Sequence, residues 1–346
     1  MFVLPLLVVL LFILGFLLYF TLVDYRPEAK EIVSTSEQPD TICIKKPLRI
    51  ATWNIGYAGL NRDMDFFYEG GTKVRPERAQ VEKNMEGICN YLFENDRESN
   101  FFLFQEIDEC AKRSYHINQI IHFGDVLYKF QPFYAMNYNV QFVPFPVTSP
   151  VGKIKSGLVT YSRHSPAIAE RHAFPFHFGW PKRLFLINRC FLVLRFPTSN
   201  GRELVLINTH NSAFDRNGEV RKAELNYFRE FLIAEYEKGN YVIVGGDFNQ
   251  SPPTICSQFE GHLFDFDEFF TIPDTLFPAE WKYAFDNSTP SNRRVNVPYR
   301  KGETKVTLID FFILSPNVSV DSVKCDDLEF EFSDHNPVRA VFRLME

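Results

Sequence analysis

Short apolar segments of strand length recur along most of the chain, and their number is the strongest constraint on its fold. Each is rich in β-branched or aromatic residues and is bounded by polar, Gly-containing or Pro-containing stretches. The clearest candidates are LRIATWNI (48–55), NFFLFQEI (100–107), SGLVTYS (156–162), RCFLVLRFP (189–197), ELVLINTH (203–210), YVIVGGDFN (241–249), VTLIDFFIL (306–314) and PVRAVFRL (337–344). This spacing predicts a protein built mainly from β-sheet.

Two longer amphipathic segments interrupt the strands. The first begins at Pro76 and places Val81, Met85 and Ile88 on one face of a helix. The second spans residues 218–238 and is ended by Gly239. Because strands outnumber helices and no internal linker divides the segments, we predict an α/β (α+β) domain with two packed sheets and helices outside.

The N-terminal residues impose a separate constraint. Residues 2–23 contain no charged side chain and are long enough to cross the core of a bilayer as a helix. No small-residue cleavage motif follows, which favours an uncleaved transmembrane helix over a signal peptide. Arg26 and Lys30 lie among acidic residues, so the positive-inside rule leaves the orientation open. We expect a single-pass membrane protein.

The segment after this helix is polar. Residues 24–46 contain two prolines and no sustained periodicity, which predicts a linker between an anchor at 1–23 and a catalytic domain at 47–346. All 37 basic and 43 acidic residues lie beyond the apolar segment, so the net charge of −6 belongs to the rest of the chain. An acidic balance does not favour a broad nucleic-acid surface, although a local basic cleft is compatible with it.

Polar side chains stand at or near the ends of six apolar segments. Asp247 and Asn249 are two residues apart after VIVGG, so both point to the same side of an extended strand. Carboxylates bind hard divalent cations, carboxylate and imidazole groups activate water, and N–H groups stabilise developing negative charge. The candidates are Asn54, Glu106, Asn208, His210, Asp247, Asn249, Asp310, Asp334 and His335. Singly, each is explained as a cap, a turn or a core residue, but together they suit phosphoester hydrolysis.

The order of these groups resembles the endonuclease/exonuclease/phosphatase superfamily. The matching motifs are W-N (53–54), Q-E (105–106), N-x-H (208–210), G-D-F-N (246–249), I-D (309–310) and S-D-H (333–335), within residues 47–345. That superfamily includes pancreatic-type deoxyribonucleases, abasic-site endonucleases, inositol polyphosphate 5-phosphatases and neutral sphingomyelinases. The resemblance implies a four-layer α/β/β/α sandwich of two mixed sheets, with the site at one end and Mg²⁺, or Mn²⁺ in its place, as cofactor.

The resemblance also implies a role for each matching residue. Asp247 orients or deprotonates the attacking water, and Asn249 contacts the phosphate. Glu106 is the principal metal ligand, with Asn54 beside it as a contact to phosphate or to metal-bound water. His210 matches the residue that stabilises the transition state. His335 matches a base, acid or phosphate donor, and Asp310 matches the carboxylate that holds the His335 imidazole. Asp334 lies toward a second metal or the leaving group, and Asn208, which shares the face of His210 on the strand, is expected to support the phosphate site.

Two aromatic segments stand outside these motifs. FGWPKRLF (178–185) has two interpretations, a site for a phosphate or membrane headgroup and an aromatic anchor with solvated charges. QPFYAMNYNVQFVPFPVTSP (131–150) is interpreted as a substrate loop or as a packed surface excursion.

These observations predict a membrane-anchored, Mg²⁺-dependent phosphodiesterase acting by in-line water attack. An anchor raises the effective concentration of lipid substrates, so we expect a phospholipid or sphingolipid headgroup ester. The first alternative is an endonuclease or exonuclease acting on DNA or RNA. The second is a catalytically inactive binding module on the same fold. The sequence indicates no protein partner.

Overall fold

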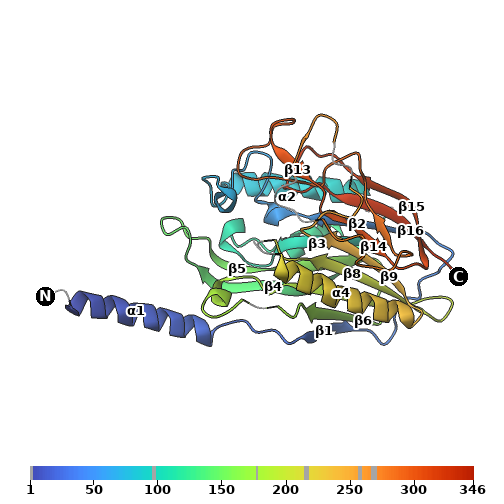
Figure 1. The fold of residues 1–346 in the computed structure, drawn as a ribbon, viewed down its shortest axis with the longest axis horizontal. Helices are drawn as coiled ribbons and strands as arrows, with labels where there is room; N and C mark the ends of the chain where they lie inside the picture. Colours follow the sequence, from blue (N-terminus) through green and yellow to red (C-terminus); the bar gives the residue numbers. More distant parts are fainter. Residues whose placement is uncertain (1–2, 96–98, 177, 214–217, 256–258, 266–270) are drawn as a thin grey trace.

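The computed structural model describes residues 3–95, 99–176, 178–213, 218–255, 259–265 and 271–346. Two large sheets pack face to face and helices cover their outer faces, while a third, small sheet lies in the C-terminal part (Figure 1). The predicted four-layer α/β/β/α class is confirmed.

The larger sheet has seven strands, and only its β8–β9 pair is parallel. Its order is β1 (Lys30–Thr35), β6 (Ile168–Ala173), β7 (Cys190–Pro197), β8 (Glu203–His210), β9 (Tyr241–Asp247), β14 (Asp310–Leu314) and β11 (Lys282–Ala284). The parallel pair has a consequence for function, because both of its strands end at the same edge of the sheet.

The second sheet has six strands, with one parallel pair, β2–β3. Its order is β15 (Val318–Cys325), β16 (Val338–Leu344), β2 (Leu48–Asn54), β3 (Phe101–Asp108), β5 (Gly152–Ser162) and β4 (Gln131–Val143). The small sheet joins β10 (Leu263–Phe264), β13 (Lys305–Thr307) and β12 (Asn292–Arg293). The predicted strand 306–314 is therefore divided, and Asp310 begins β14 rather than lying inside a strand.

The helices are few and lie at the periphery of the sandwich. The α-helices are α1 (Val3–Leu22), α2 (Arg78–Asn95), α3 (Gln119–Val126) and α4 (Glu219–Glu237), and the 3-10 turns are η1 (Gly56–Ala58), η2 (Phe67–Glu69), η3 (Lys112–Ser114) and η4 (Lys182–Phe185). Both helices predicted from periodicity are present, as α2 and α4.

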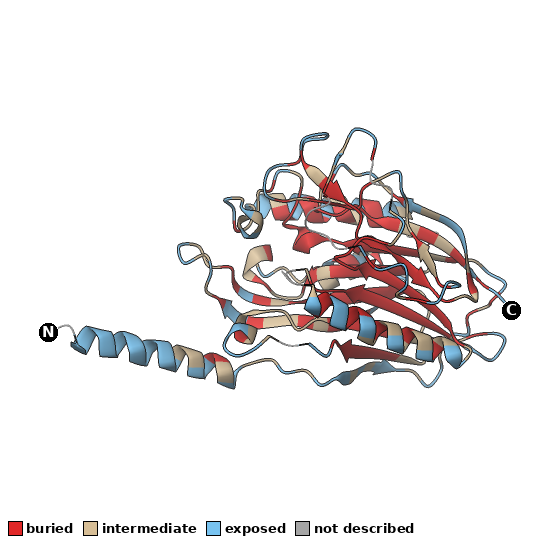
Figure 2. Cartoon of the chain, in the orientation of Figure 1, coloured by how far each residue is buried: buried red, intermediate tan, exposed pale blue. Residues whose placement is uncertain are grey.

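Strand alternation sorts the apolar side chains into three layers of core. In β8, Leu204 and Leu206 point between the two sheets, whereas Val205 and Ile207 point toward α4. On the other side, Phe102 of β3 packs with the apolar face of α2. Figure 2 shows the strands buried and the outer faces of the helices exposed. This burial is what holds the polar strand ends in place.

The expected linker at residues 24–46 is wrong in its central part. Lys30–Thr35 forms β1 and pairs antiparallel with β6, while Ile42 and Ile44 are buried between the sheets. An edge strand with one exposed face and mostly polar residues has no periodicity to distinguish it from a linker. Its structure depends on the β6 ladder, a partner far away in sequence.

The segment 131–150 is neither a loop nor a surface excursion over most of its length. Residues Gln131–Val143 form β4, which pairs along β5, and Phe133, Ala135 and Val140 are buried. Only the connection that follows, 144–151, leaves the sheet. Aromatic residues suit a half-buried strand, so the composition had a simpler explanation than substrate binding.

Helix α1 projects away from the sandwich (Figure 1) and is almost entirely exposed, apart from Phe20. Among the described residues it is the one helix whose length and composition suffice to cross a membrane, a test that a signal sequence also passes. Its C-terminal end contacts the sandwich, since Phe20 packs on Phe185 with ring centroids 5.5 Å apart.

Candidate active site

The polar strand ends meet at one edge of the sandwich because of the two parallel pairs. Register in the larger sheet sets His210 beside Asp247, and Asp247 opposite Asp310 on the antiparallel strand β14. In the second sheet, β2 and β3 end together, which brings Asn54 and Glu106 to the same edge. The two sheets thus supply facing halves of one buried polar cluster.

Asp247 lies at the centre of this cluster. Its Oδ2 accepts a hydrogen bond from Asn54 Nδ2 at 2.9 Å, and its Oδ1 accepts from the backbone N–H of Asn249 at 2.8 Å. His210 Nε2 lies 3.4 Å from the same Oδ2. Burial raises the pKa of Asp247 above its usual range, and the charge of His335 opposes that rise. The carboxylate is therefore both precisely held and more basic than a solvated aspartate.

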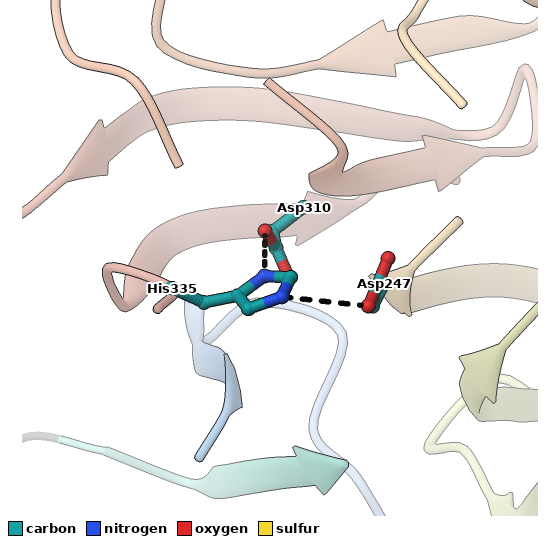
Figure 3. A group of neighbouring side chains, drawn as sticks. All are labelled: Asp247, Asp310 and His335. Atoms are coloured by element: carbon teal, nitrogen blue, oxygen red, sulfur yellow. Dashed lines mark hydrogen bonds and ion pairs between the residues drawn. The ribbon is translucent and has the colours of Figure 1, made fainter. Parts of the chain in front are cut away.

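His335 and Asp310 form a hydrogen-bonded pair (Figure 3). The Nδ1 atom of His335 lies 2.7 Å from Asp310 Oδ2, which also accepts from the hydroxyl of Ser291 at 2.7 Å. The other ring nitrogen, Nε2, lies 2.9 Å from Asn292 Nδ2 and 3.8 Å from Asp247 Oδ2. The ring is thus oriented through Nδ1, and its Nε2 faces the cluster.

The two histidines are driven toward opposite charge states. Burial lowers the pKa of His335, but Asp310, Asp334 and Asp247 outweigh it and raise that pKa to about 10. Burial lowers the pKa of His210 well below its ordinary value, and the positive charges of Arg189 and His335 add to this. These shifts favour the imidazolium form of His335 and the neutral form of His210 near neutral pH.

Two further carboxylates face the same space. Glu106 lies at an irregularity in the β3–β5 pairing, with φ of 52°, and its Oε1 is 3.4 Å from Asn54 Nδ2 and 4.0 Å from His210 Nε2. Because of this irregular backbone, the Glu106 side chain departs from the regular in-and-out alternation of the strand. About a quarter of the side-chain surface remains exposed. Burial, opposed by His335 and reinforced by Glu106, raises the pKa of Asp334 to about 7.

This donor set suits a hard divalent cation. Three carboxylates, of Glu106, Asp247 and Asp334, line one cavity, and burial raises the pKa of both aspartates. Donor atoms of Asp247, Asp310 and His335 also lie within 4.8 Å of one another. Since the Asp310–His335 hydrogen bond already occupies two of those atoms, Glu106 and Asp334 are the better placed ligands.

The cluster lies at the base of a cavity of about 260 Å³. Besides these polar residues, the cavity lining includes an extensive set of apolar side chains, called the apolar wall below: Leu60, Phe66, Val74, Val143, Val151, Ile154, Leu186 and Ile187. Three arginines reach its lining, Arg113, Arg189 and Arg294. A ligand with an anionic group and an apolar body would match both kinds of lining residue.

Eight of the nine predicted site residues meet here, and Asn208 does not. Its Nδ2 donates to the carbonyls of Phe104 and Val159, and its Oδ1 accepts from Gln105 Nε2 at 2.8 Å. The side chain is fully buried between the two sheets and does not line the cavity, so the contribution to the phosphate site predicted for it would be one of support. It joins the sheets directly behind His210, which is a positioning contribution.

Asn249 keeps its predicted place in the cavity lining, although its amide has a structural partner. Its Nδ2 donates to the Asn211 carbonyl at 2.8 Å, and its backbone adopts φ of 49°. Asparagine is one of the few residues that accept this left-handed conformation readily. The turn after β9 is thereby bent so that the Asn249 N–H reaches Asp247.

Sequence reasoning missed Ser291, Asn292 and Arg113. Ser291 and Asn292 belong to the stretch TPSN, whose composition is that of an ordinary turn, so nothing in a single sequence marks them. Arg113 pairs with buried Asp108 at 2.9 Å and covers the ring of Tyr57, with its Cζ 3.8 Å from the ring centroid. Its position in the cavity results from the fold of the η3 turn.

Two mixed sheets enclosed by helices, with paired carboxylates and histidines at one edge, define the class of α/β/β/α phosphoester hydrolases. The family model described as endonuclease/exonuclease/phosphatase family matches residues 51–335, and the chain belongs to that family. Members are phosphoester hydrolases that typically use a divalent metal.

Solved structures share the fold at low sequence identity. An endonuclease/exonuclease/phosphatase from Beutenbergia cavernae DSM 12333 is similar with a TM-score of 0.60 and 16% identity, over 87% of this chain and 72% of that one. ANGEL2, a 2',3'-cyclic phosphatase, has a TM-score of 0.55 and 13% identity, over 87% and 96%. TDP2 from Caenorhabditis elegans has 0.51 and 15%, over 90% and 77%. Among curated protein sequences, none matches this chain.

Proposed function

We propose that the protein is a divalent-metal-dependent phosphodiesterase, anchored to a membrane by α1, whose substrate is a phospholipid or sphingolipid headgroup ester. The observation that carries the proposal is the convergence of Glu106, His210, Asp247 and His335 on one cavity. Burying several titratable groups together costs stability, so such a cluster is expected where chemistry requires it.

The assigned chemistry is water attack on a phosphodiester. Asp247, made more basic by burial, accepts a proton from water, while Asn54 and the Asn249 N–H fix its two oxygens. His335 is held through Nδ1 by Asp310. For its protonated Nε2 to donate to a phosphoryl or leaving-group oxygen, the Asn292 amide 2.9 Å away must turn its oxygen toward the ring or move aside. His210 remains neutral and donates an N–H to a phosphoryl oxygen.

Glu106 and Asp334, with the Asn54 amide beside them, would hold the cation, for which we propose Mg²⁺ with Mn²⁺ as a substitute. When bound, the cation offsets negative charge on the phosphoryl oxygens. The raised pKa of Asp334 agrees with this role, because a nearby cation would relieve the crowding of carboxylates.

Lipid is favoured as substrate by the apolar cavity wall and by α1. Apolar lining side chains such as Phe66, Val143 and Leu186 suit the acyl-bearing part of a headgroup ester better than they suit a polar sugar–phosphate backbone. A membrane helix also concentrates lipid near the site, but does nothing for diffusing nucleic acid. ANGEL2 and TDP2 share the fold alone, so neither name decides the substrate.

The decisive experiment measures phosphoester hydrolysis by the full chain in detergent, with Mg²⁺ or Mn²⁺ and with EDTA. We expect activity that EDTA abolishes, and a loss of at least about a thousandfold in Asp247→Asn and in His335→Ala. His122→Ala, an exposed histidine on α3, is the matched control and should retain full activity. Full activity in either cluster variant would refute the assigned chemistry.

The substrate class needs a separate comparison. The full chain would be incubated with sphingomyelin or phosphatidylethanolamine vesicles, and in parallel with plasmid DNA and RNA. Release of a phosphorylated headgroup without nicking supports the lipid assignment. Rapid plasmid nicking with no headgroup release would overturn it in favour of a nuclease.

A further inference from the structure

The elements that build the apolar wall of the cavity also contact the end of α1. Phe185 of η4 lies against Phe16 and Phe20 of α1, with ring centroids 6.1 and 5.5 Å apart. The next two residues, Leu186 and Ile187, line the cavity. The helix therefore does not end in a free tether, and its direction is coupled to that of the cavity wall.

Polar contacts strengthen the same junction. The indole N–H of Trp180 donates to the Thr21 hydroxyl at 3.0 Å, and Arg183 Nε donates to Asp24 Oδ2 at 3.2 Å. Trp180 still keeps 54% of its surface exposed at this position beside the last turn of α1. A tryptophan that is half exposed at the end of an apolar helix is typical of a membrane–water interface.

The connection between β4 and β5 supplies a second apolar projection. Phe145 is 60% exposed and Val147 is 81% exposed, while Val143 and Val151 at its base line the cavity. In Figure 1 this connection points from the sandwich toward the same side as α1, and Figure 2 shows its tip exposed. Lys153 and Lys182, which are close in sequence to these two projections, are exposed.

We propose that Phe145, Val147 and Trp180 form a docking surface that enters the interfacial layer of the bilayer crossed by α1. The occupant is a lipid surface with anionic headgroups, because aromatic and aliphatic tips project next to an apolar helix and exposed Lys153 and Lys182 follow them closely in sequence. When these two projections dock, the cavity residues next to them, Leu186 and Val151, turn toward the membrane. The inference deepens the proposed function, and rests on it for the substrate that would enter there.

Brominated-lipid quenching tests docking independently of catalysis. The full chain carrying Val147→Trp would be reconstituted in phosphatidylcholine vesicles containing phosphatidylserine, with and without bromine on the acyl chains. We expect quenching above that of the unsubstituted protein. Val320→Trp is the matched control, an exposed valine of β15 on the side opposite α1 (Figure 1), and should add none. Equal quenching at both positions, or none at residue 147, overturns the proposal.

A second measurement separates docking from chemistry. In the double variant Phe145→Asp, Val147→Asp, hydrolysis of vesicle lipid should fall at least about tenfold, since two charges oppose insertion into the interface. Hydrolysis of a soluble phosphodiester, bis(p-nitrophenyl) phosphate, should change less than about twofold because neither side chain lines the cavity. An equal loss on both substrates contradicts the docking role. Quenching at residue 147 in a chain that hydrolyses no phosphoester would instead refute only the proposed function.

Discussion

His210 and His335 are the same residue type within one buried cluster, yet their surroundings drive them to opposite charge states. Three aspartates around His335 outweigh the effect of its burial and raise its pKa, whereas burial is the main cause of the lowered pKa of His210, with Arg189 and His335 adding to it. One fold can therefore supply a proton carrier and a neutral donor from the same side chain at the same pH. The assignment follows from neighbours contributed by different strands, and neither histidine could be assigned from its own motif.

Glu106 is the residue whose assigned role can be tested most directly. Glu106→Gln keeps the size of the side chain but removes the charge that a divalent cation requires. We expect the Mg²⁺ concentration for half-maximal hydrolysis to rise at least about tenfold. Glu109→Gln is the control, because Glu109 follows the same strand but pairs with Lys155 at 2.6 Å. An unchanged Mg²⁺ titration in Glu106→Gln would exclude it as a ligand.

At the scale of elements, the β8–β9 pair positions the edge that carries the candidate active site, and this pairing depends on Gly246. A Cβ at this position would lie 2.1 Å from the Thr209 carbonyl oxygen, on the neighbouring parallel strand. Gly246 therefore lets β9 approach β8 closely enough to set Asp247 beside His210, while Gly245 leaves room for the ring of Phe312.

Gly246→Ala should accordingly destabilise the protein by about 3 kcal/mol, because the strands must separate to accept the methyl group. Activity per folded molecule should fall as well, since the distance between His210 and Asp247 grows. Urea unfolding and turnover of the purified variant measure the two effects. Gly124→Ala in α3, where a Cβ makes only a 3.8 Å contact with Tyr161, should leave both unchanged or raise stability slightly.

The packing of α4 on the larger sheet includes a buried ion pair with a defined pH dependence. Arg195 of β7 donates to both carboxylate oxygens of Glu235 at 2.8 Å. Burial would raise the pKa of Glu235, but hydrogen bonds from Arg195 and Lys238 outweigh it and lower that pKa to about 2 from 4.5. The charged carboxylate of Glu235 is therefore more stable in the folded protein than in the unfolded chain.

The stability from this pair is complete above about pH 4.5 and is lost as the pH falls toward 2. Glu235→Gln should cost about 2 kcal/mol at pH 7, after allowance for partial solvent screening, and that difference should shrink below pH 4. Denaturant unfolding at several pH values measures it. Glu203→Gln, an exposed partner of the same arginine at 3.3 Å, should cost less than about 1 kcal/mol. A pH-independent difference would contradict the ion-pair explanation.

At the scale of the whole molecule, the segment between α1 and the first central strand is part of the folded domain. It adds β1 to the edge of the larger sheet and buries Ile42 and Ile44 between the sheets. The domain therefore begins well before residue 47, and α1 leads into it with little free chain between them.

Shortening the protein tests this boundary. A chain of residues 24–346 should fold with nearly full stability, while 47–346 should lose about 2 to 4 kcal/mol from the two isoleucines and the exposed β6 edge. Urea unfolding of both chains measures the difference, and 24–346 is the control for the loss of α1. Equal stability of the two would show that residues 24–46 act only as a linker.

The sequence alone determined the layered β-rich class, the two main helices and eight residues of the site. These are carried by local signals, namely apolar strands, helical periodicity and polar residues at strand ends, which the hydrophobic effect and chain geometry translate directly into structure. Their order along the chain was sufficient to indicate the family.

Tertiary structure alone decided the remainder. It paired the polar segment 30–35 with β6, drew 131–143 into a sheet edge, kept Asn208 out of the cavity, and brought Asn292 to its lining and Ser291 to Asp310. Apart from the β4–β5 pair, these outcomes depend on partners that are not neighbours in sequence, through a backbone ladder, a buried amide or a shared carboxylate. Such contacts have no local periodicity, because their free energy exists only once the two sheets have met.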